Sequence, residues 1–303
     1  MERWRRWMCH GTLAFAFSLP LSAQDLEPRA LSNVPVGMNF LLVGYGYVSG
    51  NVLLDPAIPI EGLDSRINTI LGAYVRTIDV FGMSGKVDVI VPVAGGDWVG
   101  FLEGEERSRV ATGAGDPRLR LSVNFLGAPA LRAGEFGGYE QGTVAGASIQ
   151  VGVPVGQYDP ERLLNLGSNR WFFKPQVGVS HTVGPWAFEA YVSTWFYTAN
   201  TDFFGGLELE QRPIWAFKTH VVRSLPRGMW VAADIGYAAG GRARVDGTLR
   251  ERQLSTARFG ATLAVPLSET HALKFTAATA TTHDLGPDFD AFGVTYQYRW
   301  GGS

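Results

Sequence analysis

The stretch Arg118-Leu119-Arg120-Leu121-Ser122-Val123-Asn124-Phe125 alternates strictly between polar and apolar side chains. Successive side chains of a β-strand point to opposite faces, so a period of two predicts a strand with one polar and one apolar face. The same alternation returns along the chain, for example at 86–93, 214–222, 257–265 and 292–300. The sequence therefore predicts an all-β protein.

Twelve strands of this kind are expected. Their predicted ranges are 38–49, 66–80, 85–94, 115–126, 142–155, 170–181, 186–198, 212–224, 229–239, 255–266, 271–282 and 289–300. A strand of about ten residues is long enough to cross a membrane at a tilt, and it exceeds the five or six residues usual in a soluble sheet. The strand lengths thus indicate membrane-spanning strands.

The connections between these strands alternate in length. Short connections at 81–84, 182–185, 225–228 and 267–270 separate long ones at 50–65, 95–114, 156–169, 199–211, 240–254 and 283–288. The exception is 127–141, a long connection where a short turn is due, in which Pro129-Ala130-Leu131 could start a small helix. Outer-membrane barrels have an even strand number, short periplasmic turns and long outer loops. The pattern favours a single antiparallel transmembrane β-barrel with both termini in the periplasm over a soluble β-sandwich.

The N-terminus resembles a secretory signal, with Arg3, Arg5 and Arg6 before the apolar run 13–19 and a cleavage site after Ala23. We expect a signal peptide at 1–23, a periplasmic segment at 24–37 and the barrel at 38–300. Cleavage removes three Arg from 26 basic residues and Glu2 from 28 acidic ones, which leaves a net charge of −4. It also removes Cys9, the only cysteine, so disulfides and cysteine metal sites are excluded. The acidic balance gives no reason to expect a nucleic-acid partner.

Tryptophans are expected at both ends of the strands. Trp171, Trp186, Trp215 and Trp300 fall on the apolar faces near strand ends, as in the two aromatic girdles of a membrane barrel. The last predicted strand ends on Trp300, and an aromatic end is typical of the signal read by the barrel-assembly machinery, although Gly301-Gly302-Ser303 follow it. The expected partners are therefore outer-membrane lipids and that machinery, in the outer membrane of a Gram-negative bacterium.

Six stretches together resemble one family. They are Arg29-Ala30-Leu31-Ser32-Asn33-Val34-Pro35-Val36-Gly37, Leu54-Asp55-Pro56, Gly115-Asp116-Pro117-Arg118, Val153-Pro154-Val155-Gly156-Gln157-Tyr158, Asn169-Arg170-Trp171 and Phe203-Phe204-Gly205-Gly206. The chain is similar to the outer-membrane transporters named for the meta-pathway of phenol degradation. The resemblance implies a barrel that passes aromatic compounds, and it brings no established site residues.

The inward face of the predicted barrel is rich in basic residues. Strand parity places nine of them inward: Arg76, Lys86, Arg118, Arg120, Lys174, Lys218, Arg258, Lys274 and Arg299. The inward acids are Asp88, Glu189 and Asp234. A cationic wall lowers the barrier to anions. If the strands of Asp88 and Arg120 pair in register, Asp88 neutralises one of the two neighbouring arginines.

Aromatic side chains are also expected in the lumen, at Tyr74, Phe172, Tyr191 and Trp195. Near Arg or Lys they could hold a ring bearing a carboxylate or phenolate, although filling the space of a narrow barrel is the simpler explanation. The residues predicted to line a pore or bind substrate are Arg76, Lys86, Asp88, Arg118, Arg120, Lys174, Tyr191, Trp195, Lys218, Arg258 and Lys274.

The sequence favours a channel for passive uptake of small organic compounds, aromatic or anionic. Two alternatives stay open: a structural barrel with a closed lumen of paired charges, and a barrel enzyme acting on lipids. Such an enzyme needs a Ser–His pair facing the membrane, and neither that pair nor a Gly-x-Ser-x-Gly motif is found. No cofactor is expected, and no metal site, because the histidines are scattered. The oligomeric state is left open.

Overall fold

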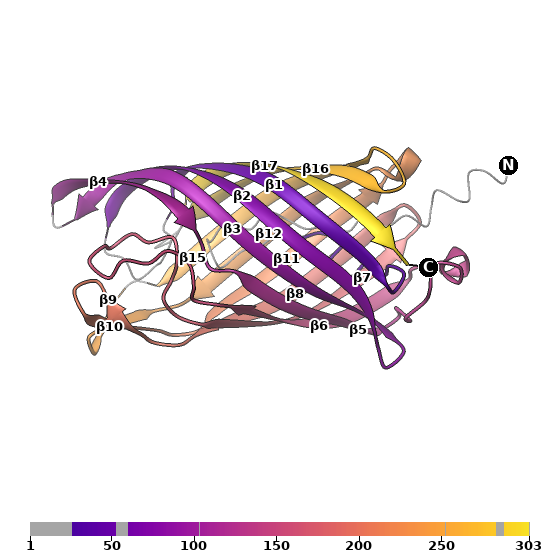
Figure 1. The fold of residues 1–303 in the computed structure, drawn as a ribbon, viewed down its shortest axis with the longest axis horizontal. Coiled ribbons are helices and arrows are strands. Elements are labelled where there is room, and N and C mark those ends of the chain that lie inside the picture. Colours follow the sequence, from indigo (N-terminus) through magenta and orange to yellow (C-terminus); the bar gives the residue numbers. More distant parts are fainter. Residues whose placement is uncertain (1–25, 53–59, 103, 252, 283–287, 303) are drawn as a thin grey trace.

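The computed structural model describes residues 26–52, 60–102, 104–251, 253–282 and 288–302, and the predicted signal peptide lies outside them. The main feature is one closed antiparallel sheet (Figure 1). Its strands are β1 (Met38–Asn51), β2 (Glu61–Val80), β3 (Met83–Leu102), β4 (Glu105–Ala114), β5 (Arg118–Leu126), β6 (Thr143–Gly152), β7 (Phe172–Val183), β8 (Trp186–Tyr197), β11 (Ile214–Ser224), β12 (Trp230–Gly240), β15 (Leu254–Pro266), β16 (His271–Thr282) and β17 (Asp288–Gly301).

The thirteen strands form a twelve-stranded barrel, because β4 and β5 are two halves of one barrel strand. β3 pairs with β4 along its residues 93–102 and with β5 along 85–90, and Gly115-Asp116-Pro117 breaks the strand between them. The first and last strands close the sheet, with Met38 opposite Gly301 and Asn51 opposite Asp288. A closed sheet pairs its backbone groups and leaves no edge. The predicted all-β barrel is confirmed.

The start of β1 at Met38 and the end of β17 at Gly301 lie at one end of the barrel, which we call the terminal end (Figure 1). The tight turns at 81–82, 184–185 and 267–270 are at this end, together with the short 3₁₀ helix η3 (Pro226–Gly228). The opposite end, the loop end, carries the longer connections except 127–141, which lies at the terminal end as expected. In the described residues the predicted alternation of short and long connections is therefore confirmed.

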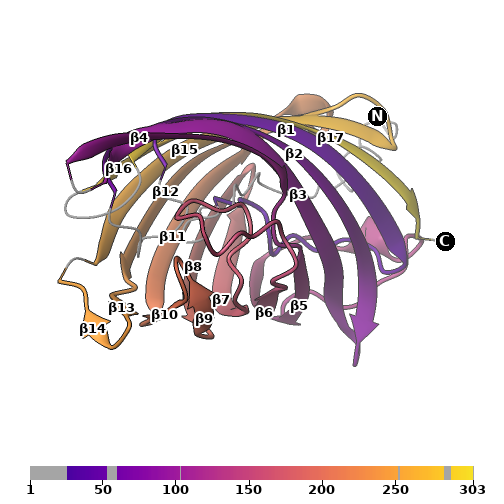
Figure 2. The same cartoon turned by 60° about the vertical axis from the view of Figure 1, so that its left-hand side comes forward.

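The loop end contains more strand than predicted. The expected loop 95–114 is instead a hairpin of β3 and β4, paired from Val93–Ala114 to Leu102–Glu105, which extends beyond the barrel. The expected loops 199–211 and 240–254 pair with each other in a small sheet of β9 (Asn200–Phe203), β10 (Leu207–Gln211), β13 (Ala243–Val245) and β14 (Thr248–Leu249) (Figure 2). The small sheet buries Phe203, Leu209, Ala243 and Val245 against one another, but its strands are too short to show a clear alternation in the sequence.

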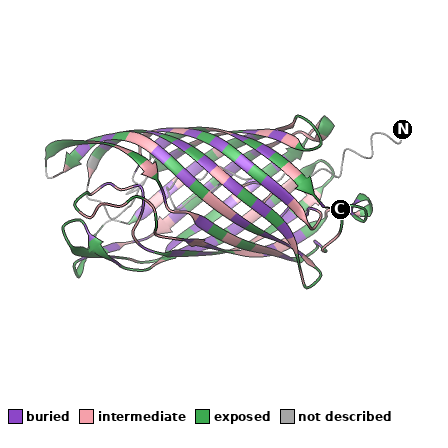
Figure 3. Ribbon diagram, viewed as in Figure 1, coloured by how far each residue is buried: buried purple, intermediate pink, exposed green. Residues whose placement is uncertain are grey.

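Burial alternates along each barrel strand (Figure 3). Outward side chains such as Leu119 and Leu121 are apolar and exposed, as a lipid-facing surface requires. The four predicted girdle tryptophans are also exposed, at 38–59%, and lie at the two strand ends. No helix among the described residues is long and apolar enough to cross a membrane.

Candidate functional site

The barrel lumen is occupied by the chain's own N-terminal residues. Residues 26–34, here called the lumen segment, run from the terminal end into the ring of strands (Figure 2). The backbone N–H of Arg29 donates to Glu189 Oε2 at 2.7 Å, and Lys86 Nζ donates to the carbonyl of Ala30 at 2.7 Å. The described part of the segment expected at 24–37 therefore contacts the inner wall of the barrel, which satisfies these polar groups.

The lumen segment adopts turns and irregular backbone, not a strand. Arg29 has a φ of 65°, in the left-handed region that non-glycine residues rarely adopt. This conformation turns the Arg29 guanidinium toward Trp230, 5.6 Å from the ring centroid. The segment is therefore held by side chains and single backbone contacts, and it is no part of the sheet.

Glycines on the inner wall make room for the segment. A Cβ built at Gly146 would lie 2.6 Å from Leu31, and one at Gly260 would lie 2.7 Å from Leu26. Leu26 also lies against Gly236. The lumen segment thus packs against the wall where inward-facing glycines leave space.

Most of the predicted pore-lining residues do face the lumen. Buried there, each at most 7% exposed, are Lys86, Asp88, Arg118, Lys174, Tyr191, Trp195, Lys218, Arg258 and Lys274. The side chain of Arg120 is 12% exposed. Phe172 is also buried, and so are the predicted inward acids Glu189 and Asp234. Charged side chains this inaccessible to water show that the lumen is filled at their level.

The placement of Arg76 and Tyr74 is an error of strand parity. Both side chains are exposed on the outward face of β2, where Tyr74 approaches Trp300 with ring centroids 6.3 Å apart. The inward face there is apolar instead: Val34 of the lumen segment packs with Phe40, Leu42, Leu71, Ala73 and Val75. A lumen filled by protein has an apolar core locally, so the rule that polar residues point inward fails in this strand. Arg299 is only partly buried, near the terminal end.

Arg120 stands at the centre of the charged lumen. Asp88 and Arg120 are opposite each other in the β3–β5 register, as predicted, and Arg120 Nε donates to Asp88 Oδ2 at 2.9 Å. The rest of the guanidinium grips Glu27 of the lumen segment, with Nη1–Oε2 at 2.6 Å and Nη2–Oε1 at 3.1 Å. Such forked charge-assisted pairs are stronger than neutral hydrogen bonds. Lys218 and Lys274 also attract the Glu27 carboxylate.

A second polar cluster lies on β7, β8, β11 and β12. Glu189 accepts hydrogen bonds from Ser180 Oγ and Tyr191 Oη, both at 3.1 Å. His220 Nδ1 is 2.6 Å from Asp234 Oδ1, and both side chains are fully buried. The two wall acids are thus bonded to neighbouring wall groups.

Among the described residues, three cations that belong to the inner wall itself lie over aromatic rings. Lys174 Nζ is 4.4 Å from the Trp195 ring centroid, Lys218 Nζ is 5.6 Å from that of Tyr191, and Arg258 Cζ is 4.9 Å from that of Phe289. The first two pairs join residues predicted to bind a ring bearing a negative charge. The geometry brings together a cation and an aromatic face, which is what such a ligand requires.

The loop end is covered by residues 153–171, here called the cover loop. Asp116, in the break between β4 and β5, accepts hydrogen bonds from the backbone N–H groups of Gly156 and Ser168 at 2.8 and 2.7 Å, and from Ser168 Oγ at 2.6 Å. Leu164 and Leu166 of the loop are buried against Trp98 and the barrel wall. The Gly-Asp-Pro stretch therefore fastens a loop across the mouth.

The long connection 127–141 holds the lumen segment where it enters the barrel. Asn33 Nδ2 donates to the backbone carbonyl of Pro129 at 3.1 Å. The N–H of Val36 donates to the backbone carbonyl of Leu131 at 2.9 Å. Its only helix is a 3₁₀ turn, η2 (Phe136–Gly138), so the helix expected at 129–131 is wrong because those backbone groups bond to the segment and to the 81–82 turn. The extra length of this connection supplies the backbone carbonyls that hold the N-terminal residues at the barrel entrance.

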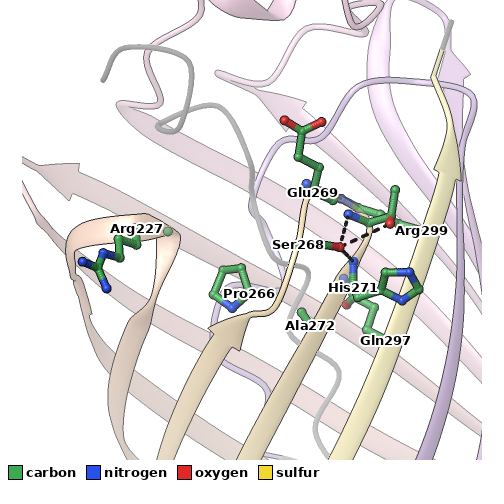
Figure 4. Close-up of a pocket in the computed structure, with 10 residues that line it drawn as sticks. Arg227, Pro266, Ser268, Glu269, His271, Ala272, Gln297 and Arg299 are labelled. Atoms are coloured by element: carbon green, nitrogen blue, oxygen red, sulfur yellow. Dashed lines mark hydrogen bonds between the residues drawn. The ribbon is translucent and has the colours of Figure 1, made fainter. Parts of the chain in front are cut away.

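A small depression of about 20 Å³ at the terminal end contains a serine near a histidine (Figure 4). Ser268 Oγ accepts from the backbone N–H groups of Thr270 and His271, both at 3.2 Å, and His271 Nδ1 is 2.6 Å from Tyr296 Oη. The pair is therefore arranged as a turn and not as a nucleophile with its base. Within the described residues no cluster of three potential metal ligands occurs.

The sequence interpretation missed Glu27, Arg29 and Leu26. The signal that could have found them is the run of inward glycines at 146, 178, 236 and 260, since a lumen wall without side chains leaves space that something must fill. The segment 29–37 is also the first of the six stretches that carry the family resemblance.

Comparison with solved structures finds the same fold in outer-membrane proteins. The chain is similar to the COG4313 outer membrane channel from Pseudomonas putida F1, with a TM-score of 0.75 and 18% identity over 91% of this chain and 100% of that one. It is also similar to the beta domain of the Bordetella autotransporter BrkA (TM-score 0.54, 11% identity, 87% and 100% covered) and to the transport unit of the autotransporter AIDA-I from Escherichia coli (0.52, 8%, 97% and 96%).

A closed barrel with an apolar outward face is the β-structure that spans the bacterial outer membrane, so the chain is a Gram-negative outer-membrane protein. No curated protein matches the sequence. A family model described as "Putative MetA-pathway of phenol degradation" matches residues 50–300, which confirms the resemblance drawn from the motifs. The chain belongs to this phenol-degradation family.

Proposed function

We propose that this protein is a channel that passes small organic anions, aromatic carboxylates among them, through the outer membrane. The charge of the inner wall carries the proposal. Seven basic residues of the predicted set are buried in the lumen or nearly so (Lys86, Arg118, Arg120, Lys174, Lys218, Arg258 and Lys274), against the three acids Asp88, Glu189 and Asp234.

This excess favours anions for an electrostatic reason. A cation in the lumen would meet more like charges than opposite ones, and the low-dielectric wall strengthens that difference. An anion finds Arg120, which can exchange the Glu27 carboxylate for another carboxylate, with lysine side chains close by. The cations over Trp195 and Tyr191 add faces on which an aromatic ring can stack.

Passage requires movement, because the lumen segment and the cover loop obstruct the lumen at its middle and at its loop end. Both are attached by side chains and a few backbone bonds, so both can move without breaking the barrel sheet. Segments of low local stability are the ones that open in gating.

The test is the reversal potential of refolded protein in a planar bilayer under a salt gradient. Anion preference is expected for the natural chain, and Arg118→Glu with Arg120→Glu should reduce or reverse it because each exchange changes the wall by two charges. Arg107→Glu with Arg109→Glu is the matched control, since both arginines lie on the β4 part of the hairpin. Cation preference in the natural chain, or unchanged selectivity in the lumen variant, would contradict the proposal. A bilayer without current in every variant would favour a structural barrel.

A further inference from the structure

We propose that the middle of the lumen is a binding site for a carboxylate that carries a compact apolar group, and that Leu26 and Glu27 of the chain's own N-terminal segment occupy it as a stand-in for that ligand. The inference rests on the proposed channel function and names its substrate class. It also assigns the lumen segment a role as an internal blocker of the site.

The carboxylate half of the site is formed by Arg120 and three lysines. Arg120 presents two nitrogens to Glu27 in the forked geometry that suits a carboxylate, while its third nitrogen is fixed by Asp88. Lys86, Lys218 and Lys274 surround this pair closely enough to attract Glu27. Asp88 holds the guanidinium through Nε, a bond that does not involve Glu27, and this favours a pre-organised site.

Lys274 gives an independent indication that the site is built for more negative charge than Glu27 supplies. Its side chain is 5% exposed, and its Nζ has no hydrogen-bond partner among the described residues. An ammonium group buried without a partner costs free energy. A ligand that brings carboxylate oxygens into the lumen can provide the missing acceptor.

The apolar half of the site is formed by the cradle of glycines. Leu26 lies against Gly236 and Gly260, at 3.2 and 2.7 Å from the positions that their Cβ atoms would take. The segment therefore places a compact apolar side chain directly beside a carboxylate. A ligand that replaces these two residues needs the same two features in the same order, as in a benzoate or a short branched fatty acid.

Space for such a ligand adjoins the segment on both sides. A void of about 20 Å³ lies between Glu27, Lys86, Arg120 and Tyr191, and another of about 40 Å³ lies between Leu26, Asp234 and Arg258. Each is the size of one or two water molecules. Together with the volume that the segment vacates, they leave room for a single aromatic ring.

The segment is attached weakly enough to leave. Among the described residues, its backbone hydrogen bonds to the lumen wall join Arg29 to Glu189, Ala30 to Lys86, Leu31 to Tyr191, and Leu31 to Asn124 at 3.3 Å. The left-handed conformation of Arg29 is a strain that departure relieves. Its firm attachments, at Asn33 and Val36, lie at the barrel entrance and can act as a hinge.

The experiment is equilibrium dialysis of refolded, signal-free protein with radiolabelled benzoate. The natural chain should bind one benzoate per barrel, and benzamide, the neutral analogue, should not compete for it. Glu27→Gln should bind benzoate at least tenfold more tightly, because it removes the internal carboxylate but keeps its size. Leu26→Ala should also tighten benzoate binding, because it removes the internal apolar side chain. Glu161→Gln, which changes an exposed loop glutamate, should leave benzoate binding unchanged.

A second measurement follows the segment itself. The mature chain has no cysteine, so Ala30→Cys gives a single thiol inside the lumen. Benzoate should accelerate its reaction with a water-soluble maleimide, and benzamide should not. Equal benzoate affinity in Glu27→Gln and the natural chain, with both barrels folded by their heat-modifiable mobility, would overturn the proposal, as would equal competition by benzamide.

The two proposals fail differently. If benzoate binds and Glu27→Gln binds it more tightly, but no variant carries anion current, the result supports the carboxylate site and contradicts the channel function. A second outcome is an anion current whose selectivity depends on Arg118 and Arg120, with no effect of Glu27→Gln on benzoate binding or on current. That outcome supports the channel function and contradicts the proposed carboxylate site.

Discussion

The side chain of Leu31 fills the space that a Cβ at Gly146 would need, 2.6 Å from its position. The same relationship joins Leu26 to Gly260 and Gly236. The inner wall and the segment it encloses are therefore complementary in shape as well as in charge. Glycine costs a strand about 0.5–1 kcal/mol relative to alanine, so these positions trade strand stability for room in the lumen.

This complementarity predicts a coupling between Gly260 and Leu26. Gly260→Ala should destabilise the barrel by about 1–3 kcal/mol, because the added methyl overlaps Leu26. In a Leu26→Ala background the same change should be neutral or stabilising, since the overlap is gone. Urea unfolding in lipid vesicles measures both values. Additive effects of the two changes would show that Leu26 does not occupy the cradle.

The outward face should reject charge in a manner that depends on depth. Leu121→Arg, in the middle of a barrel strand on the lipid side, should cost about 2–4 kcal/mol. The control is Val183→Arg, at the last residue of β7, which should cost at most about 1 kcal/mol because it lies near the interface. The same urea titration applies, and similar costs at both positions would place Leu121 outside the bilayer.

The carboxylate of Asp116 should control access to the cover loop. Asp116→Ala removes the acceptor for Gly156 and Ser168, so trypsin cleavage after Arg162 on intact cells should accelerate by roughly tenfold. Asp202→Ala is the control, because Asp202 accepts from Tyr158 through its backbone carbonyl. Arg227, in η3 at the terminal end, should stay uncut in every case. Cleavage after Arg227 from outside the cell would show that the terminal end faces outward, and would contradict the expected orientation.

The aromatic face of Trp195 should distinguish ring-bearing anions from simple ones. In a conducting barrel, Trp195→Ala should weaken block by benzoate by roughly 3- to 30-fold, the equivalent of ~0.5–2 kcal/mol, and leave block by acetate unchanged. Trp215→Ala, which removes a tryptophan from the outward face, should alter neither. Equal effects on benzoate and acetate would mean that Trp195 only fills space.

The barrel itself could be predicted because its signals repeat. Most strands show a period of two, and most connections indicate by their length the end of the barrel at which they lie. The pairing of Asp88 with Arg120 was predictable from the same regularity, since two neighbouring strands of opposite direction align those positions. Lipid on the outside imposes this pattern on every strand.

The contents of the lumen were less predictable, because no solvent imposes a uniform pattern there. Arg76 was placed on the wrong face since β2 turns an apolar row inward, toward Val34. The position of Glu27 could not be read from alternation at all, because the segment is not a strand. Contacts between residues that are distant in the sequence, such as Glu27 with Arg120, leave no periodic signal.

The attachment of Glu27 to β1 sets a concentration threshold. A group joined to its site by a short length of chain acts like a ligand present at an effective concentration of ~1 mM or more, and the anchors at Asn33 and Val36 shorten the free length further. An external acid that binds no better than Glu27 enters only when its concentration outside exceeds that value. Acids below that concentration would then not displace Glu27, and acids above it would. The threshold concentration is set by the length of chain between Glu27 and its anchors.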